Sequence, residues 1–234
     1  MLKRISFVVI LFAILIVNFQ SVFAFTESKV KDYLEDREKA WPEWVLTNLK
    51  YSDLHQDLIY PNWFEGNWLI RSQDATDNPS EPIFYRVNFY KNQFQQIVGN
   101  RSENSESIGK AIFGDRLLKV KTDPKSFNNQ IIYLINDEYI DSRIISRTQI
   151  NEENLFISDE LFIQTVHKSG VSRINQVEVM SRFYNCDRNY ENSVDSVKQI
   201  CGLQYLSTYG SKVGENNVKA VTNKKYFLTF QSID

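Results

Sequence analysis

The feature that most constrains this chain is an alternation of apolar and polar residues with a period of two, which begins near Trp68 and continues almost to the C-terminus. In residues 83–90, for example, every second position from Ile83 to Phe89 is apolar or aromatic. Successive side chains of a strand point to opposite faces, so this alternation predicts strands with one buried face. About ten such runs follow one another, at 68–71, 83–90, 93–98, 117–122, 131–136, 140–148, 161–167, 173–183, 202–209 and 225–231.

Short turn signals separate many of these runs, among them Asp123-Pro124, Asn136-Asp137 and Ser169-Gly170. Such pairs are typical of tight connections between neighbouring antiparallel strands. We therefore expect an all-β fold, an up-and-down antiparallel β-barrel of about 8–10 strands. No linker rich in Pro, Gly and Ser divides the chain, which favours a single β domain.

The first strand of this barrel begins in the stretch 60–71, which contains Gly66-Asn67-Trp68. A glycine two residues before a tryptophan lets another segment pass close by, while the large indole can fill the end of a barrel. Gly-x-Trp on a first strand resembles the lipocalin and wider calycin barrels. That resemblance implies that Trp68 lies at the closed end of the barrel.

Two short helices are expected outside the strand runs. Residues 29–39 are rich in charges and carry Val30, Tyr33 and Leu34 at helical spacing. Trp41 and Trp44 follow, and we expect them to dock this arm on the barrel as a strap; the alternative is an arm that contacts a partner.

The second expected helix covers residues 105–114. It has Ser and Glu at its start and a terminating Gly114. Because it interrupts the meander between early strands, it can plug one barrel mouth or gate it.

The N-terminus has the pattern of an export signal. Lys3 and Arg4 precede an apolar run at 5–17, and Val22-Phe23-Ala24 offers a cleavage site. We expect a signal peptide at 1–24 with cleavage near Ala24, a helix and docking arm at 25–58, and a β-barrel domain at 59–234. The alternative for the first segment is an uncleaved anchor.

The two cysteines, Cys186 and Cys201, flank a polar loop. In an exported protein such a pair predicts a disulfide bond, and the alternative is two free buried thiols. They do not make a metal site with His55 and His167, because the spacing is wrong for ligands of one ion.

Several function classes are excluded by composition and motifs. Without residues 1–24 the formal charge changes from −2 to −4, and no cluster of basic residues favours a nucleic-acid partner. The sequence contains no nucleotide-binding or hydrolase motif, and both histidines are expected to be exposed. Asp159 and Glu160 are adjacent on a strand, so they point to opposite faces and do not form an acid–base pair. We therefore assign no catalytic residue and no metal ligand.

Glu178 and Arg182 share one face of a predicted strand, while Val177, Val179 and Phe183 make the better core face. We expect Glu178 and Arg182 to form an ordinary ion pair on the outer surface. The alternative, an inward pair, would anchor the polar head group of a ligand.

The chain also carries a series of ordered motifs, at 59–68, 98–101, 108–111, 114–116, 123–124, 158–161 and 181–183. This series is similar to one family of unknown function, made up of exported cyanobacterial proteins, with plastid relatives in plants, that carry the domain of unknown function 6816. The resemblance covers roughly residue 41 to the C-terminus and implies a location in the thylakoid lumen or the periplasm, without implying a catalytic residue.

The aromatic content, with 16 Phe, 12 Tyr and 4 Trp, is high enough to line a cavity for an apolar molecule. We expect a bound lipid, isoprenoid or pigment and no required cofactor; the alternative is that the rings simply fill the core. The residues expected to line the cavity are Trp68, Tyr85, Phe89, Tyr133, Phe183 and Tyr205.

Two further functions remain open. One is an accessory or assembly factor that contacts a thylakoid membrane complex through Trp41 and Trp44. The other, a more distant alternative, is a chromophore lyase or isomerase on a calycin barrel.

Overall fold

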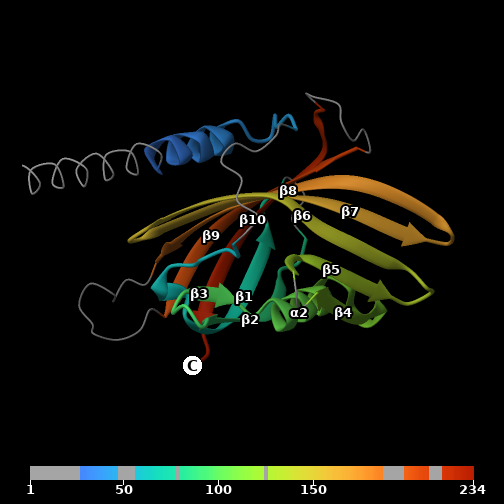
Figure 1. The fold of residues 1–234 in the computed structure, drawn as a ribbon, viewed down its shortest axis with the longest axis horizontal. Coiled ribbons are helices and arrows are strands. Elements are labelled where there is room, and N and C mark those ends of the chain that lie inside the picture. The colour runs from blue at the N-terminus through green and yellow to red at the C-terminus, as the bar shows by residue number, and fades with distance from the viewer. Residues whose placement is uncertain (1–26, 47–55, 77–79, 124–125, 187–197, 211–217) are drawn as a thin grey trace, which may run out of the picture.

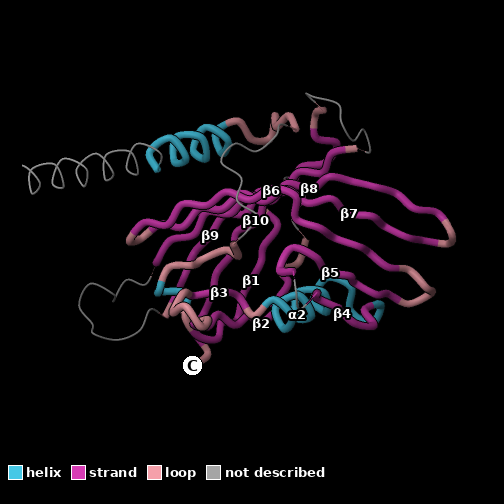
Figure 2. Tube along the Cα trace, viewed as in Figure 1, coloured by secondary structure: helices cyan, strands magenta, loops and turns pink. Residues whose placement is uncertain are grey.

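The computed structural model describes residues 27–46, 56–76, 80–123, 126–186, 198–210 and 218–234. The predicted signal peptide therefore lies outside the described residues, as do His55 and the loop 187–197. Ten strands form one antiparallel sheet (Figures 1 and 2). The elements in chain order are η1 (Asn62–Phe64), β1 (Gly66–Asp74), β2 (Ile83–Lys91), β3 (Ile97–Gly99), α2 (Arg101–Phe113), η2 (Gly114–Arg116), β4 (Leu117–Asp123), β5 (Ser126–Leu134), β6 (Tyr139–Glu152), β7 (Leu155–Lys168), β8 (Val171–Asn185), β9 (Gln199–Tyr209) and β10 (Ala220–Ser232).

The strand order across the sheet is β3-β2-β1-β10-β9-β8-β7-β6-β5-β4. Strands that follow one another in the chain are neighbours, with the exception of β3 and β4, and the last strand, β10, pairs with the first, β1. The predicted all-β, up-and-down architecture is confirmed. The sheet curls into a half-barrel whose edge strands, β3 and β4, are not paired with each other (Figure 1). The barrel is therefore open along one seam.

Local turn chemistry explains the long hairpins. Asn136 and Asp137, between β5 and β6, have φ values of 60° and 57°, and Ser169 and Gly170, between β7 and β8, have 50° and 76°. Positive φ at both central residues gives the turn twist that matches two antiparallel strands. The turn signals in the sequence thus fix where these strands reverse.

Helix α2 fills part of the open seam by binding the free edge of β2. Ser107 Oγ accepts a hydrogen bond from the backbone N–H of Arg86 (3.0 Å). The Asn104 side chain accepts from the N–H of Asn88 (2.8 Å) and donates to its carbonyl (3.0 Å). These bonds satisfy edge groups that would otherwise face solvent.

The opposite side of α2 packs on β4, where Gly109 lies against Leu117 and Val120. The predicted helix is confirmed, and it begins earlier than expected because Asn100 caps it by accepting from the N–H of Glu103.

A segment before the first strand closes the seam next to β3. Ile59 exchanges hydrogen bonds with the Gln149 side chain of β6: its N–H donates to Oε1 (3.1 Å) and its carbonyl accepts from Nε2 (3.3 Å). The N–H of Tyr60 donates to the carbonyl of Ile97 on β3 (2.9 Å). Residues 56–60 therefore bridge β3 and β6 without forming a full strand.

An aromatic cluster fills one end of the concave face. Trp68 is 1% exposed, and its indole N–H donates to the carbonyl of Phe64 (2.8 Å). Gly202 gives space for the ring of Phe183, which a Cβ at that position would meet. We call this cluster the aromatic plug; its buried rings are Phe64, Trp68, Phe89, Phe156, Phe183 and Phe230.

The N-terminal helix, at residues 27–39, lies on the convex face of the sheet (Figure 1). Leu34 is fully buried and Trp44 is 1% exposed, both in an apolar cluster with Met180 and Tyr209 of the convex face. We call residues 27–46 the strap. Among the described residues, no helix has both the length and the apolar character needed to span a bilayer.

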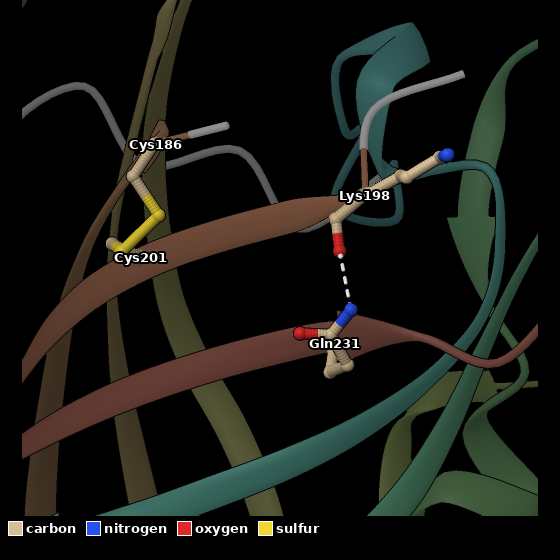
Figure 3. The surroundings of a disulfide bond; sticks show 4 residues. All are labelled: Cys186, Lys198, Cys201 and Gln231. Atoms are coloured by element: carbon tan, nitrogen blue, oxygen red, sulfur yellow. Dashed lines mark hydrogen bonds between the residues drawn. A yellow bond between two sulfur atoms is a disulfide. The ribbon is translucent and has the colours of Figure 1, made fainter. Parts of the chain in front are cut away.

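The predicted disulfide between Cys186 and Cys201 is present, with the two Cα atoms 5.7 Å apart (Figure 3). It ties the end of β8 to β9. On the neighbouring strand β10, Gln231 donates to the carbonyl of Lys198 (3.3 Å), which further holds this end of the sheet (Figure 3).

Candidate functional site

The concave face divides into a packed end and a half-exposed middle. Tyr85 of β2 and Tyr226 of β10 are half-buried and pack on the margin of the aromatic plug. Beyond them, inward-facing side chains that are only partly covered lie among buried ones such as Ile144 and Val177, and this partly exposed zone is the candidate site.

Three apolar residues line the candidate site from adjacent strands. Phe162 of β7, Val179 of β8 and Leu206 of β9 all point to the concave side and are half-buried. Val179 lies directly opposite Leu206, and Phe162 is one inward position further along β7. An inward apolar surface that the protein leaves partly uncovered can be covered by an apolar ligand.

A row of hydrogen-bonding side chains separates this apolar surface from the aromatic plug. Ser158, Ser181, Gln204 and Tyr226 occupy facing positions on β7 to β10. Gln204 Nε2 donates to Ser181 Oγ (3.1 Å). Ser158 Oγ, Gln204 Oε1 and the Tyr226 hydroxyl have no hydrogen-bond partner among the described residues. The row therefore combines unused donors and acceptors.

An ion pair borders the site on the β6 side. Arg147 Nε donates to Glu160 (2.7 Å), and the two side chains are 3% and 15% exposed. Arg147 Nη1 also donates to the carbonyl of Gln56 in the seam segment (2.6 Å). The buried guanidinium thus links the site to the closure of the seam.

A second pair borders the site on the β10 side, where Lys224 Nζ donates to Asp74 (2.9 Å). Hydrogen bonds from the Thr76 hydroxyl and from Lys224 lower the pKa of Asp74 to about 2. A third pair, Arg101 with Asp57, joins α2 to the seam segment.

The structure does not bring the six predicted cavity residues together. Trp68, Phe89 and Phe183 are buried within the aromatic plug, and Tyr85 lies at its margin. Tyr133 and Tyr205 face the convex side.

Tyr133 is paired with Tyr139 of β6, on the face opposite to Phe162. Tyr205 packs under the strap, with its ring centroid 5.4 Å from that of Trp41, and its hydroxyl donates to Glu38 (2.9 Å). The sequence predicts that Tyr205 points inward, but its ring lies on the convex face, where Trp41, Trp44 and Glu38 of the strap cover it.

Sequence reasoning missed the polar row. The sequence signal for this row is the alternation of side chains along β8. Phe183 and Val179 point inward, so Ser181, which lies two residues from each, points inward as well.

The predicted pairing of Glu178 with Arg182 is wrong. Both side chains face the convex side, as expected, but each binds the strap instead. Glu178 is 1% exposed and accepts from Arg37 Nε (2.8 Å) and Nη2 (2.6 Å), with a further bond from the Tyr209 hydroxyl. Arg182 donates to Glu38 (2.9 Å). The strap helix therefore supplies partners that the strand alone does not show.

Asp159 lies beside this pair and is fully buried. It faces the convex side while Glu160 faces the concave side, which confirms the prediction that these neighbours point to opposite faces. Neither carboxyl oxygen of Asp159 receives a hydrogen bond. Burial, and then the negative charge of Glu178, raise the pKa of Asp159 well above its ordinary range. The group is held as a neutral acid beneath the strap.

His167 lies at the end of the β7–β8 hairpin, with Nδ1 2.8 Å from the Ser172 hydroxyl and its ring stacked on Tyr139. The pair is exposed, and its bond links two facing positions of the hairpin. Among the described residues, no group of His, Cys, Asp and Glu side chains is placed to hold a metal ion.

A groove of about 340 Å³ lies between α2 and β2. Its amide side chains are already used by the fold: Asn88 donates to Asn67 (2.9 Å), and Asn104 binds the edge of β2. We therefore place the candidate site on the concave face.

A family model for a domain of unknown function, DUF6816, matches residues 72–234. The chain belongs to the DUF6816 family. The DUF6816 match contains β2 to β10, and hence Phe162, Val179, Leu206 and the whole polar row. It begins after Trp68, so the Gly-x-Trp sequence is not part of it. No curated protein and no solved structure matches the chain.

Proposed function

We propose that this protein is a non-catalytic binding protein that holds a small apolar molecule, such as a lipid, an isoprenoid or a pigment, on the concave face of its sheet. One observation carries the proposal. Phe162, Val179 and Leu206 face inward and stay partly exposed, although the aromatic plug beside them is closely packed. Covering these side chains removes apolar surface from water, which is the main driving force for binding such a ligand.

The proposal includes export, to the periplasm or a thylakoid lumen. The basic and apolar N-terminal pattern supports it. The Cys186–Cys201 disulfide is compatible with an oxidising compartment.

The function as an accessory factor has less support. Trp44 is buried, and Trp41 lies on Tyr205. A partner that uses these indoles would first have to displace the strap from the convex face.

A titration with the neutral fluorescent probe Nile red tests binding at this site. We expect saturable fluorescence enhancement with the wild-type protein, and a loss of at least ten-fold in affinity with Phe162→Arg. Phe84→Arg is the matched control, because Phe84 points outward from β2 and is 55% exposed. Val179→Gln gives a second, smaller polar change at the site. Equal affinities for the wild type, Phe162→Arg and Val179→Gln would place the probe elsewhere and overturn the proposal.

A further inference from the structure

We propose that the ligand carries an uncharged, hydrogen-bonding head group, such as an alcohol, ketone or amide, and that Ser158, Gln204 and Tyr226 bind it. This inference rests on the proposed function and adds the chemical class of the ligand. It follows from the charges around the site and from the hydrogen-bonding groups left unused there.

The cations that border the site are each neutralised by a carboxylate of the protein. Arg147 binds Glu160, and Lys224 binds Asp74. At the seam, Arg101 binds Asp57. A carboxylate or phosphate entering this zone would have to displace one of these acids, and it would lose its own hydration as well. The site therefore disfavours an anionic head group.

The polar row offers what a neutral head group needs. The Tyr226 hydroxyl can donate, Gln204 Oε1 can accept, and Ser158 Oγ can do either. These three groups lack partners among the described residues, and Ser158 is 5% exposed. None of these three atoms is fully buried, so the head group of a ligand can reach them and supply a hydrogen-bond partner. With its head on this row, the ligand would extend its apolar part over Val179 and Leu206.

Arg173 faces inward and is not part of these ion pairs. It therefore offers an alternative position for an anionic head group. It lies on β8 opposite Val166 and is exposed at the far end of the concave face. Val166 is eight residues from Ser158 along β7, or roughly 26 Å at strand spacing. An anion at Arg173 would stay in water and would not reach the polar row.

Retinol and retinoic acid form a suitable probe pair, because they share the apolar part and differ in the head group. Each is measured at pH 7 by its displacement of Nile red. We expect retinol to bind at least ten-fold more tightly than retinoic acid. Tyr226→Phe, which removes only a hydroxyl, should weaken retinol about five-fold and change retinoic acid less than two-fold. Tyr90→Phe is the matched control, because Tyr90 points outward from β2 and is 47% exposed.

The outcomes separate this inference from the proposed function. Equal binding of the two retinoids, or tighter binding of retinoic acid that is lost in Arg173→Gln, overturns the neutral head group and leaves the binding function standing. Displacement of bound Nile red by neither retinoid also contradicts the inference. If Nile red itself does not bind, both the inference and the proposed function fail.

Discussion

Replacing Arg37 with Met tests whether the strap is fixed to the sheet by a buried ion pair. Arg37 and Glu178 are 10% and 1% exposed, and two hydrogen bonds of 2.8 and 2.6 Å join them. Methionine keeps much of the apolar contact that the arginine stem makes near Trp44, over which the guanidinium lies at 4.8 Å. It leaves the Glu178 carboxylate buried without a cation, next to the Tyr209 hydroxyl and the protonated carboxyl of Asp159.

Removing one partner of a buried pair costs about 3–5 kcal/mol, because the remaining charge has no compensation. We expect Arg37→Met to lower the free energy of unfolding by that amount, measured by urea denaturation of the oxidised protein at pH 7 with tryptophan fluorescence.

Arg182→Met is the matched control, because Arg182 of β8 binds Glu38 of the same strap. Its pair with Glu38 is more exposed, at 28% and 19%, and we expect a loss of about 1 kcal/mol. Removing the stranded charge in the double variant Arg37→Met, Glu178→Leu should recover at least ~2 kcal/mol relative to Arg37→Met. Equal losses for Arg37→Met and Arg182→Met would show that the Glu178 carboxylate is not buried beneath the strap.

Three other perturbations test separate parts of the structure. The raised pKa of Asp159 means that the folded protein keeps a proton that the unfolded chain releases above about pH 4, so stability falls as the pH rises through the raised folded pKa. Asp159→Asn should remove this dependence in urea midpoints measured from pH 4 to pH 8; parallel wild-type and variant curves would argue against it. Cys201→Ser should cost roughly 3 kcal/mol for a cross-link spanning 15 residues, whereas an unchanged urea midpoint on reducing the wild type would count against a disulfide. Asn104→Ala, which frees the edge of β2, should cost about 1–3 kcal/mol, with the exposed helix position Ser102→Ala near zero; similar values for both would contradict the edge-binding role of α2.

The strands and turns could be predicted because their signals are local. The alternation of apolar and polar residues over a few positions determines which side chains of a strand point inward. Asn136-Asp137 and Ser169-Gly170 determine where two hairpins reverse. The start and end of α2 follow in the same way from Asn100 and Gly114.

The way in which the seam between β3 and β6 is bridged could not be predicted, because it depends on contacts between distant residues. The bonds between Ile59 and Gln149 join positions 90 residues apart, and no periodicity indicates them. The burial of Glu178 likewise depends on Arg37, which lies 141 residues away.

The rings expected to line a cavity are also placed by contacts that the sequence does not show. Tyr85 lies at the margin of the concave zone, whereas Tyr205 is turned to the strap. The number of aromatic residues indicates that a cavity can be lined, but the face on which each ring lies depends on strand register. For Tyr133, which pairs with Tyr139 of β6, that register is shifted by a bulge between Ile144 and Ser146.

Native mass spectrometry with absorbance, on protein isolated from its own cells, tests the ligand-binding claim most directly. We predict that the wild type and Phe84→Arg carry an apolar molecule that organic solvent removes, and that Phe162→Arg, purified in the same way and shown to be folded, does not. Bare protein in all three preparations, or the same bound molecule in all three, would contradict binding on the concave face.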